Sequence, residues 1–192
     1  MKRNKIFSVH NLTMMAALTA IQIILARYLS IQSEMFRFSF ETIPLALAGL
    51  WLGPVPAMLV ALVSDIIGFS LAGIGVYFPP LTAGPVIFAL ICGLGSRYWL
   101  GDGVADMKNG WKVFLITIVA GIVNSLLIGG IAFTLYQIFV LGTEGSFGNL
   151  LWINLGSRLA TKPVTIIGTA LLVTLLNKAV YKPVIGRIVK RA

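Results

Sequence analysis

Long apolar runs, separated by short segments rich in glycine, proline and charged residues, divide this chain along its whole length. A helix of about 20 apolar residues crosses a bilayer, so these runs predict an all-α integral membrane protein with about six crossings. We expect the transmembrane helices at residues 9–29, 40–52, 54–72, 80–100, 111–141 and 149–176. They are expected to pack as one compact bundle, with residues 1–192 forming a single transmembrane domain.

The basic residues indicate which loops face the cytoplasm. Of the 15 lysines and arginines, 11 lie in three groups: Lys2, Arg3 and Lys5; Arg97, Lys108 and Lys112; and Lys178, Lys182, Arg187, Lys190 and Arg191. The loops on the other side, at residues 30–39, 73–79 and 142–148, contain one basic residue, Arg37. By the positive-inside rule, both termini are predicted to be cytoplasmic. The net charge of +9 therefore reflects membrane topology rather than a nucleic-acid-binding surface.

Composition places the chain in the same class and excludes several kinds of chemistry. Hydrophobic residues make up 58% of the chain, charged residues make up 11%, and the mean hydropathy is +0.94. Cys92 is the only cysteine and is expected to be a buried small side chain, while the only histidine, His10, lies near the basic N-terminus. The sequence contains neither a phosphate-binding GxxxxGK[ST] loop nor an HExxH motif. We therefore expect no enzymatic activity, no metal and no cofactor.

Four charged residues lie inside stretches that are otherwise apolar enough to cross a bilayer: Arg27, Asp65, Arg158 and Lys162. Charges at membrane depth cost at least a few kcal/mol each, so they usually face a cavity or a partner. Asn154, Arg158 and Lys162 are spaced four residues apart and share one helical face. Three cations against one anion predict a pocket, open to the extracellular side, for a mostly anionic small molecule. The alternative is a buried packing network in which Asp65 pairs with an arginine.

Further polar and aromatic residues fall in the predicted outer half of the bundle: Arg37, Tyr77, Asn124, Tyr136, Trp152 and Asn154. Aromatic side chains in this position can stack on a flat heteroaromatic ligand. The alternative for each of them is the interfacial aromatic belt of a membrane protein. Ala16 and Ala20, on the first helix, form a small-xxx-small pair that permits close helix approach.

Several segments carry a family resemblance: Arg27-Tyr28-Leu29-Ser30-Ile31, Phe36-Arg37-Phe38-Ser39-Phe40-Glu41-Thr42-Ile43-Pro44, Gly53-Pro54 and Ser64-Asp65-Ile66-Ile67-Gly68. They resemble the S components, the substrate-binding subunits, of energy-coupling factor (ECF) vitamin transporters. The Arg-Phe-Ser-Phe form and the segment Tyr77-Phe78-Pro79 resemble the folate-specific branch. The match covers about residues 15–90 and is looser afterwards.

The resemblance implies an importer subunit in the bacterial cell membrane that captures folate from outside. It would deliver folate by docking on a transmembrane coupling subunit, while two cytoplasmic ATPase subunits supply the energy. Ala16 and Ala20 match the family's AxxxA motif, which the resemblance assigns to this docking rather than to internal packing.

Folate also fits the candidate residues chemically. Its two carboxylates suit Arg27, Arg37, Arg158 or Lys162, and its pterin N–H donors suit Asp65, Asn124 or Asn154. Its rings can stack on Tyr77, Tyr136 or Trp152. Asp65 also has a purely structural alternative. Other hypotheses are an S component for riboflavin, thiamine, pantothenate or a pyrimidine precursor, and an independent channel or ion-coupled carrier.

Overall fold

The computed structural model describes residues 8–27, 31–32, 37–38, 40–72, 77–101 and 109–180. Helices dominate these residues, and the strands are a two-residue antiparallel pair in which Ile31 lies opposite Phe38. The elements are α1 (Val9–Arg27), β1 (Ile31–Gln32), β2 (Arg37–Phe38), α2 (Thr42–Leu52), α3 (Pro54–Ala72), α4 (Pro79–Gly95), the π-helix η1 (Ser96–Leu100), α5 (Gly110–Ile122), the π-helix η4 (Val123–Ile128), α6 (Gly129–Phe139) and α7 (Phe147–Val180).

These helices follow the predicted apolar runs closely. Five helical stretches in the described part of the chain are long and apolar enough to span a membrane: Val9–Ala26, Pro54–Leu71, Pro79–Leu100, Gly110–Phe139 and Phe147–Val180. The remaining apolar helix, α2, has 11 residues and is shorter than a usual crossing. The helical membrane-protein class is confirmed, whereas a sixth full crossing stays a prediction.

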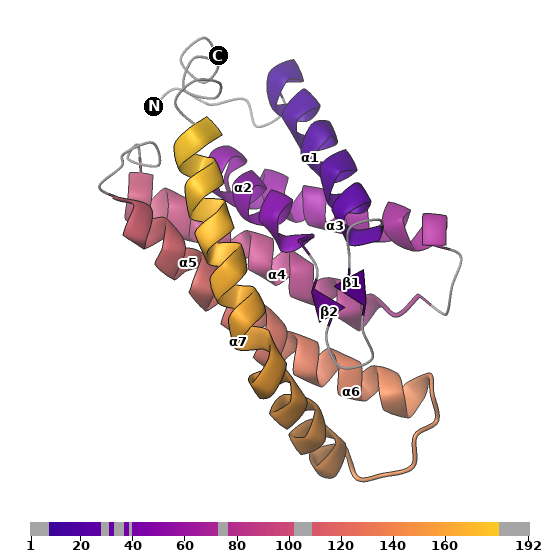
Figure 1. The fold of residues 1–192 in the computed structure, drawn as a ribbon. Coiled ribbons are helices and arrows are strands. Elements are labelled where there is room, and N and C mark those ends of the chain that lie inside the picture. Colours follow the sequence, from indigo (N-terminus) through magenta and orange to yellow (C-terminus); the bar gives the residue numbers. More distant parts are fainter. Residues whose placement is uncertain are drawn as a thin grey trace.

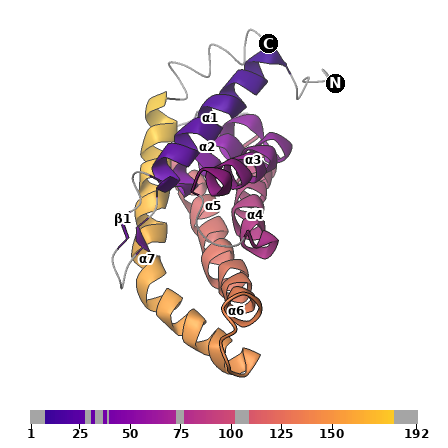
Figure 2. The same ribbon diagram turned by 90° about the vertical axis from the view of Figure 1, so that its right-hand side faces the viewer.

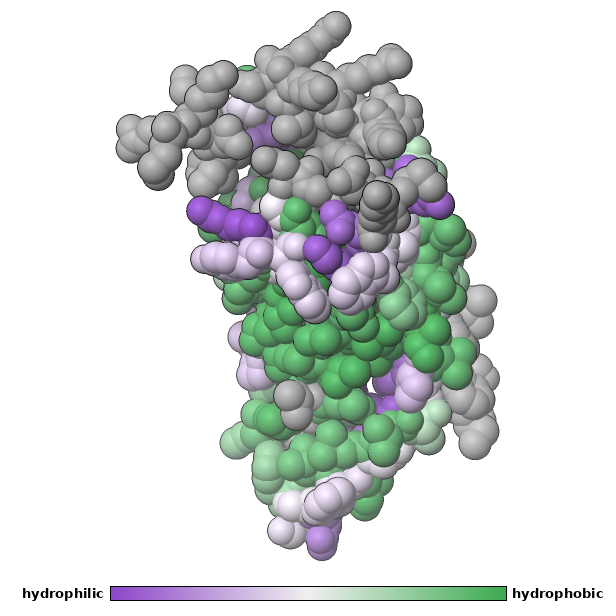
Figure 3. Space-filling view, turned by 90° about the vertical axis from the view of Figure 1, so that its left-hand side faces the viewer, coloured by the Kyte–Doolittle hydropathy of each residue, from purple (hydrophilic) through white to green (hydrophobic). Residues whose placement is uncertain are grey.

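The helices form an elongated bundle with recognisable ends. Figure 1 shows α1 beginning and α7 ending at the same end, while the connection from α6 to α7 lies at the other. In Figure 2, α7 curves along one side of the bundle, and Pro163 lies within its 34 residues. A proline removes one helical hydrogen bond and commonly bends a helix. The face in Figure 3 carries a broad band of hydrophobic residues between more hydrophilic regions, as expected for a surface that contacts lipid tails.

The short helix α2 lies at the centre of the core. Every residue from Ile43 to Leu50 is buried, and α2 packs against α1, α3, α4 and α7. A tight turn separates α2 from α3, and in it Gly53 adopts a φ of 89° that favours glycine. Cys92 of α4 is fully buried, as predicted. It faces Gly49, where an added Cβ would lie 2.7 Å from the Cys92 Cβ, so small residues allow α2 and α4 to approach closely.

Gly93 contacts the start of α3, and replacing it tests this close packing. A Cβ on Gly93 would lie 2.6 Å from the backbone nitrogen of Pro54 and 2.9 Å from the carbonyl carbon of Gly53, and backbone atoms cannot move aside cheaply. We expect Gly93→Ala to destabilise the purified protein by about 1–3 kcal/mol, which lowers its thermal midpoint by several degrees. The matched control is Gly168→Ala, since an added Cβ there meets nothing within 4 Å. Equal midpoints for the two variants would contradict the close approach.

Candidate functional site

A hydrogen-bonded group joins α3 to the first turn of α4. The Thr82 hydroxyl donates to Oδ2 of Asp65, and the Tyr77 hydroxyl lies 2.9 Å from the Thr82 oxygen. Because Thr82 has one hydroxyl hydrogen and gives it to the carboxylate, Tyr77 must be the donor to Thr82. Among the residues that the structure describes, Oδ1 of Asp65 and the lone pairs of the Tyr77 oxygen then remain as acceptors. This part of the bundle therefore suits a ligand that presents N–H donors.

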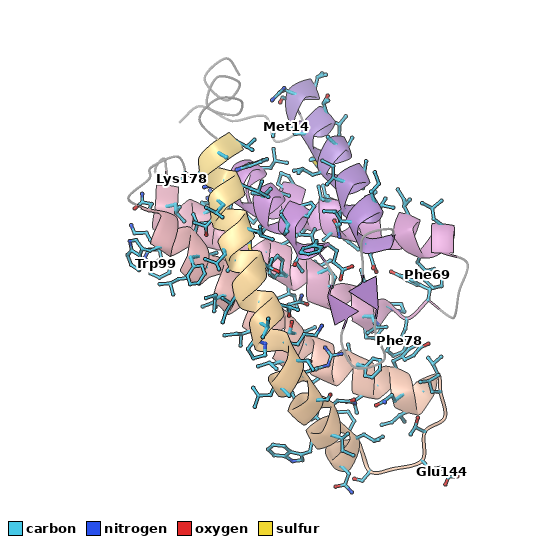
Figure 4. The ribbon with its side chains drawn as sticks, viewed as in Figure 1. Met14, Phe69, Phe78, Trp99, Glu144 and Lys178 are labelled. Atoms are coloured by element: carbon cyan, nitrogen blue, oxygen red, sulfur yellow. The ribbon has the colours of Figure 1, made fainter. Side chains whose placement is uncertain are left out.

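A row of aromatic rings begins at this group and continues to α6. Phe69 and Tyr77 have ring centroids 5.2 Å apart, and Phe78 contacts Tyr136 edge-on at 5.8 Å. Tyr136 also lies nearly parallel to Phe133, with centroids 6.3 Å apart. In Figure 4, Phe69 and Phe78 lie on the side of the bundle where α3 ends, with α6 beneath Phe78. Flat aromatic ligands are bound by such side chains.

The guanidinium of Arg158, on α7, lies at the α6 end of this row. Its Nη1 donates to the backbone carbonyl of Ser125 at 3.1 Å, and its central carbon lies 5.5 Å from the centroid of the Phe133 ring. Among the described residues it makes no ion pair with a carboxylate. Asp65 is likewise bonded to Thr82 rather than to a cation in this part of the chain. The two charges are thus held by neutral groups instead of by each other.

Asn154 lies one turn before Arg158 and also faces α6. It is buried, and its Nδ2 donates to Thr134 at 3.0 Å and to Gln137 at 2.7 Å. With both amide hydrogens engaged, the Oδ1 atom of Asn154 is left as an acceptor. Asn154 and Arg158 therefore contact the same neighbouring helix, in agreement with their spacing of four residues.

The other predicted residues on the later helices have different surroundings. Asn124 lies in η4, and its Oδ1 occupies the space beside Gly84 of α4, where an added Cβ would come within 2.5 Å. Lys162 is half-buried on α7. Trp152 is 77% exposed on the same helix, which favours the membrane-interface alternative over ligand stacking. The predicted ligand roles of all three stay predictions.

Two predicted residues have side chains outside the described residues. The backbone of Arg27 ends α1, and that of Arg37 lies in β2 opposite Gln32. Their predicted contacts with a ligand stay predictions.

The sequence analysis missed several partners of the residues above. Thr82 bonds to two candidates, and Phe133, Thr134 and Gln137 are the α6 side chains that receive Arg158 and Asn154. A signal existed, because Gln137 lies four residues after Phe133 and three after Thr134, the spacings that place side chains on one helical face. That face became visible only once α7 was seen to pack on it.

Ala16 and Ala20 lie on the outside of the bundle. Both are exposed and line a groove between α1 and α3 with a volume of about 420 Å³. The groove is almost entirely apolar, with these further lining residues: Leu12, Met15, Thr19, Ile23, Leu59, Val60, Val63 and Ile67. Internal packing does not fill this space, so the two alanines present an apolar surface to whatever lies beside the bundle.

The family comparison identifies the class of membrane protein to which this helical bundle belongs. The family model for the substrate-specific component of ECF transporters matches residues 10–177. The chain belongs to this family.

Individual relatives are folate transporters. The chain is 36% identical over 80 residues to the folate transporter FolT of Clostridium novyi, which covers 42% of this chain and 46% of that protein. It is 30% identical over 114 residues to FolT of Leuconostoc mesenteroides, covering 59% of this chain and 60% of that protein. The matched stretches thus span about half of each curated relative. A crystal structure of FolT bound with folic acid has a TM-score of 0.64 and 22% identity, covering 86% of this chain and 93% of that one, which shows a shared fold.

Asn154 of α7 bonds to Thr134 and Gln137 of α6, and this clamp between the two helices can be tested without any ligand. Replacing it in Asn154→Ala removes two hydrogen bonds between α6 and α7 and leaves buried Thr134 without its amide partner. We expect a loss of about 1–3 kcal/mol in stability, measured as a lower thermal midpoint in detergent. Asn149→Ala is the matched control, because Asn149 is exposed on the same helix. A similar midpoint for both variants would show that the clamp contributes little.

Proposed function

We propose that this protein is the folate-capturing S component of an ECF-type importer. The observation that carries the proposal is the sequence of groups around the site: acceptors at Asp65 and Tyr77, a row of aromatic rings, and a guanidinium at Arg158 that lacks a carboxylate partner among the described residues. Folate presents the complementary groups in the same order: pterin N–H donors, flat rings and two carboxylates. The folate transporters among its relatives and the folic-acid-bound structural neighbour support the same assignment.

The pocket would open to the outside of a bacterial cell membrane that the chain crosses six times. The three groups of basic residues support cytoplasmic termini through the positive-inside rule. Figure 1 is compatible with this topology, because α1 begins and α7 ends at one end of the bundle. The 11 residues of α2 span about 16 Å of the roughly 30 Å hydrocarbon core, so α2 would cross only together with flanking residues and local bilayer thinning.

Release of folate inside the cell would depend on other subunits. The chain contains no phosphate-binding loop of its own, so two cytoplasmic ATPase subunits would supply the energy through a transmembrane coupling subunit. The groove between α1 and α3 is the proposed docking surface for that coupling subunit. Its small residues, Ala16 and Ala20, would let a partner helix approach closely.

The competing ligands differ in what they leave unsatisfied. Riboflavin and thiamine offer no carboxylate to Arg158, whereas pantothenate offers a carboxylate but no ring for the aromatic row. An ion-coupled carrier would bind its substrate in a sodium- or proton-dependent manner and would transport it alone. These differences allow one panel of ligands to separate the hypotheses.

The purified protein is expected to bind folate tightly and without sodium. Folate at about 100 times its Kd adds about 2.7 kcal/mol to stability, so the thermal midpoint rises clearly, while riboflavin, thiamine and pantothenate leave it unchanged. Isothermal titration then gives the Kd, and liposomes containing this protein alone show little folate flux. Tight binding of another vitamin without folate binding would refute the substrate, and flux in those liposomes would refute the dependence on partners.

The docking surface is testable separately from binding. Ala16→Leu would fill the groove, so we expect folate binding by the purified subunit to be unchanged and folate uptake by cells that express the whole transporter to fall to background. Ala17→Leu is the matched control, because Ala17 is exposed on the same helix but does not line the groove. Normal uptake by the Ala16→Leu variant would exclude the groove as the docking surface.

A further inference from the structure

The π-helix η4 changes which backbone groups are available beside α7. In an α-helix, the N–H of Gly129 would bond to the carbonyl of Ser125, four residues earlier. Here it donates to the carbonyl of Asn124, five residues earlier. The Ser125 carbonyl thus does not accept from Gly129, and it accepts a bond from Nη1 of Arg158 at 3.1 Å. Single π-turns of this kind occur frequently at functional sites.

Gly129 is the residue that makes room for this arrangement. A Cβ at Gly129 would lie 2.7 Å from Nη1 of Arg158 and 2.8 Å from the carbonyl oxygen of Asn124. Any side chain would thus press on the guanidinium and on the π-turn at once. Only glycine accommodates both at their observed positions.

Phe133, one turn after Gly129, is the second group that contacts the Arg158 guanidinium. Its ring lies 5.5 Å from the central carbon of the guanidinium, within the range of a cation–π contact. The carbonyl of Ser125 and the Phe133 ring hold the guanidinium without neutralising its charge. A guanidinium has five N–H donors in a planar fork that fits a carboxylate, and the bond to Ser125 uses one of them.

We propose that Gly129 and Phe133 are positioning residues that fix the Arg158 guanidinium for a carboxylate of the ligand. This proposal rests on the proposed function, since it assigns the carboxylate end of folate to one side of the same site. The two residues set how strongly the protein prefers a ligand with carboxylates over the bare pterin ring. Phe133 lies at the Arg158 end of the aromatic row, away from the Asp65 group proposed for the pterin, so neither residue is expected to contact the pterin ring.

The test compares three probes that share a pterin: folate, with two carboxylates, pteroic acid, with one, and 6-methylpterin, with none. Binding constants are measured by titration calorimetry for the unaltered protein, Gly129→Ala, Phe133→Leu and Gly156→Ala. Gly156 is the matched control, because it lies two residues from Arg158 on α7 and an added Cβ there meets nothing within 4 Å. Thermal midpoints verify that each variant is folded.

In Gly129→Ala we expect the preference for folate over 6-methylpterin to fall by about tenfold, with the Kd of 6-methylpterin nearly unchanged. Phe133→Leu, which keeps an apolar side chain but removes the ring, is expected to lower the same preference by a smaller factor. Gly156→Ala is expected to behave as the unaltered protein. Phe133→Leu keeps the test decisive if Gly129→Ala fails to fold.

Two outcomes would overturn the inference while folate binding stands. One is an unchanged preference in both variants, and the other is an equal loss of affinity for folate and for 6-methylpterin, which would indicate a general disturbance of the pocket. If the unaltered protein does not bind folate at all, the proposed function fails as well. The titration of folate into the unaltered protein, in the same experiment, shows this directly.

Discussion

Arg158 places a guanidinium within a bundle whose other lining is mostly apolar, and this single charge constrains three helical segments. A charge in such surroundings is costly unless neighbouring groups satisfy it. The structure satisfies it with a backbone carbonyl from η4 and an aromatic ring from α6, both neutral. This arrangement includes the π-turn in which that carbonyl does not accept from Gly129, the glycine that leaves room for the nitrogen, and the Asn154 clamp that holds α7 against α6. These features meet at one side chain, so a change in any of them is expected to disturb how Arg158 is held.

Small residues recur where polar side chains meet a helix backbone. Gly84 leaves space for the Asn124 side chain between α4 and η4, as Gly129 does for Arg158. In the core, Gly49 plays a different part, because it brings α2 against Cys92 of α4 without any polar group. The bundle thus uses glycine both to tighten its apolar core and to admit polar groups into it. Glycines that admit polar groups therefore indicate the candidate site more specifically than glycines that tighten the core.

Much of the fold followed from the sequence, because apolar runs between charged loops fix helix positions directly. The predicted bounds 54–72 coincide with α3, and the predicted run 111–141 is one continuous helical stretch. Its π-turn was not predictable, since nearly every residue there is apolar and no periodicity marks a shifted hydrogen bond. The α6 face that receives Asn154 and Arg158 had a signal in its spacing, but the sequence did not show that α7 packs on it. The spacing of Asn154 and Arg158 was visible because polar residues stand out on an apolar helix. Trp152 was predicted from its aromatic side chain and its depth in the membrane, and neither of these shows in which direction a side chain points; it is 77% exposed.

The separation of Asp65 from Arg158 has a consequence for how the site responds to its ligand. If the two charges formed an ion pair, a ligand would have to break that pair before gaining its own contacts, and much of the gain in affinity would be lost. Instead, Thr82 holds the carboxylate and the η4 carbonyl holds the guanidinium, so both are oriented in advance. A ligand with donors at one end and carboxylates at the other would then give Asp65 hydrogen bonds and give Arg158 the counter-charge that the other described residues do not supply. Such a ligand would contact α3, α4, α6 and α7 together. Its binding would therefore link α3 and α4 to α6 and α7. A ligand that links these helices would be expected to make the bundle more rigid.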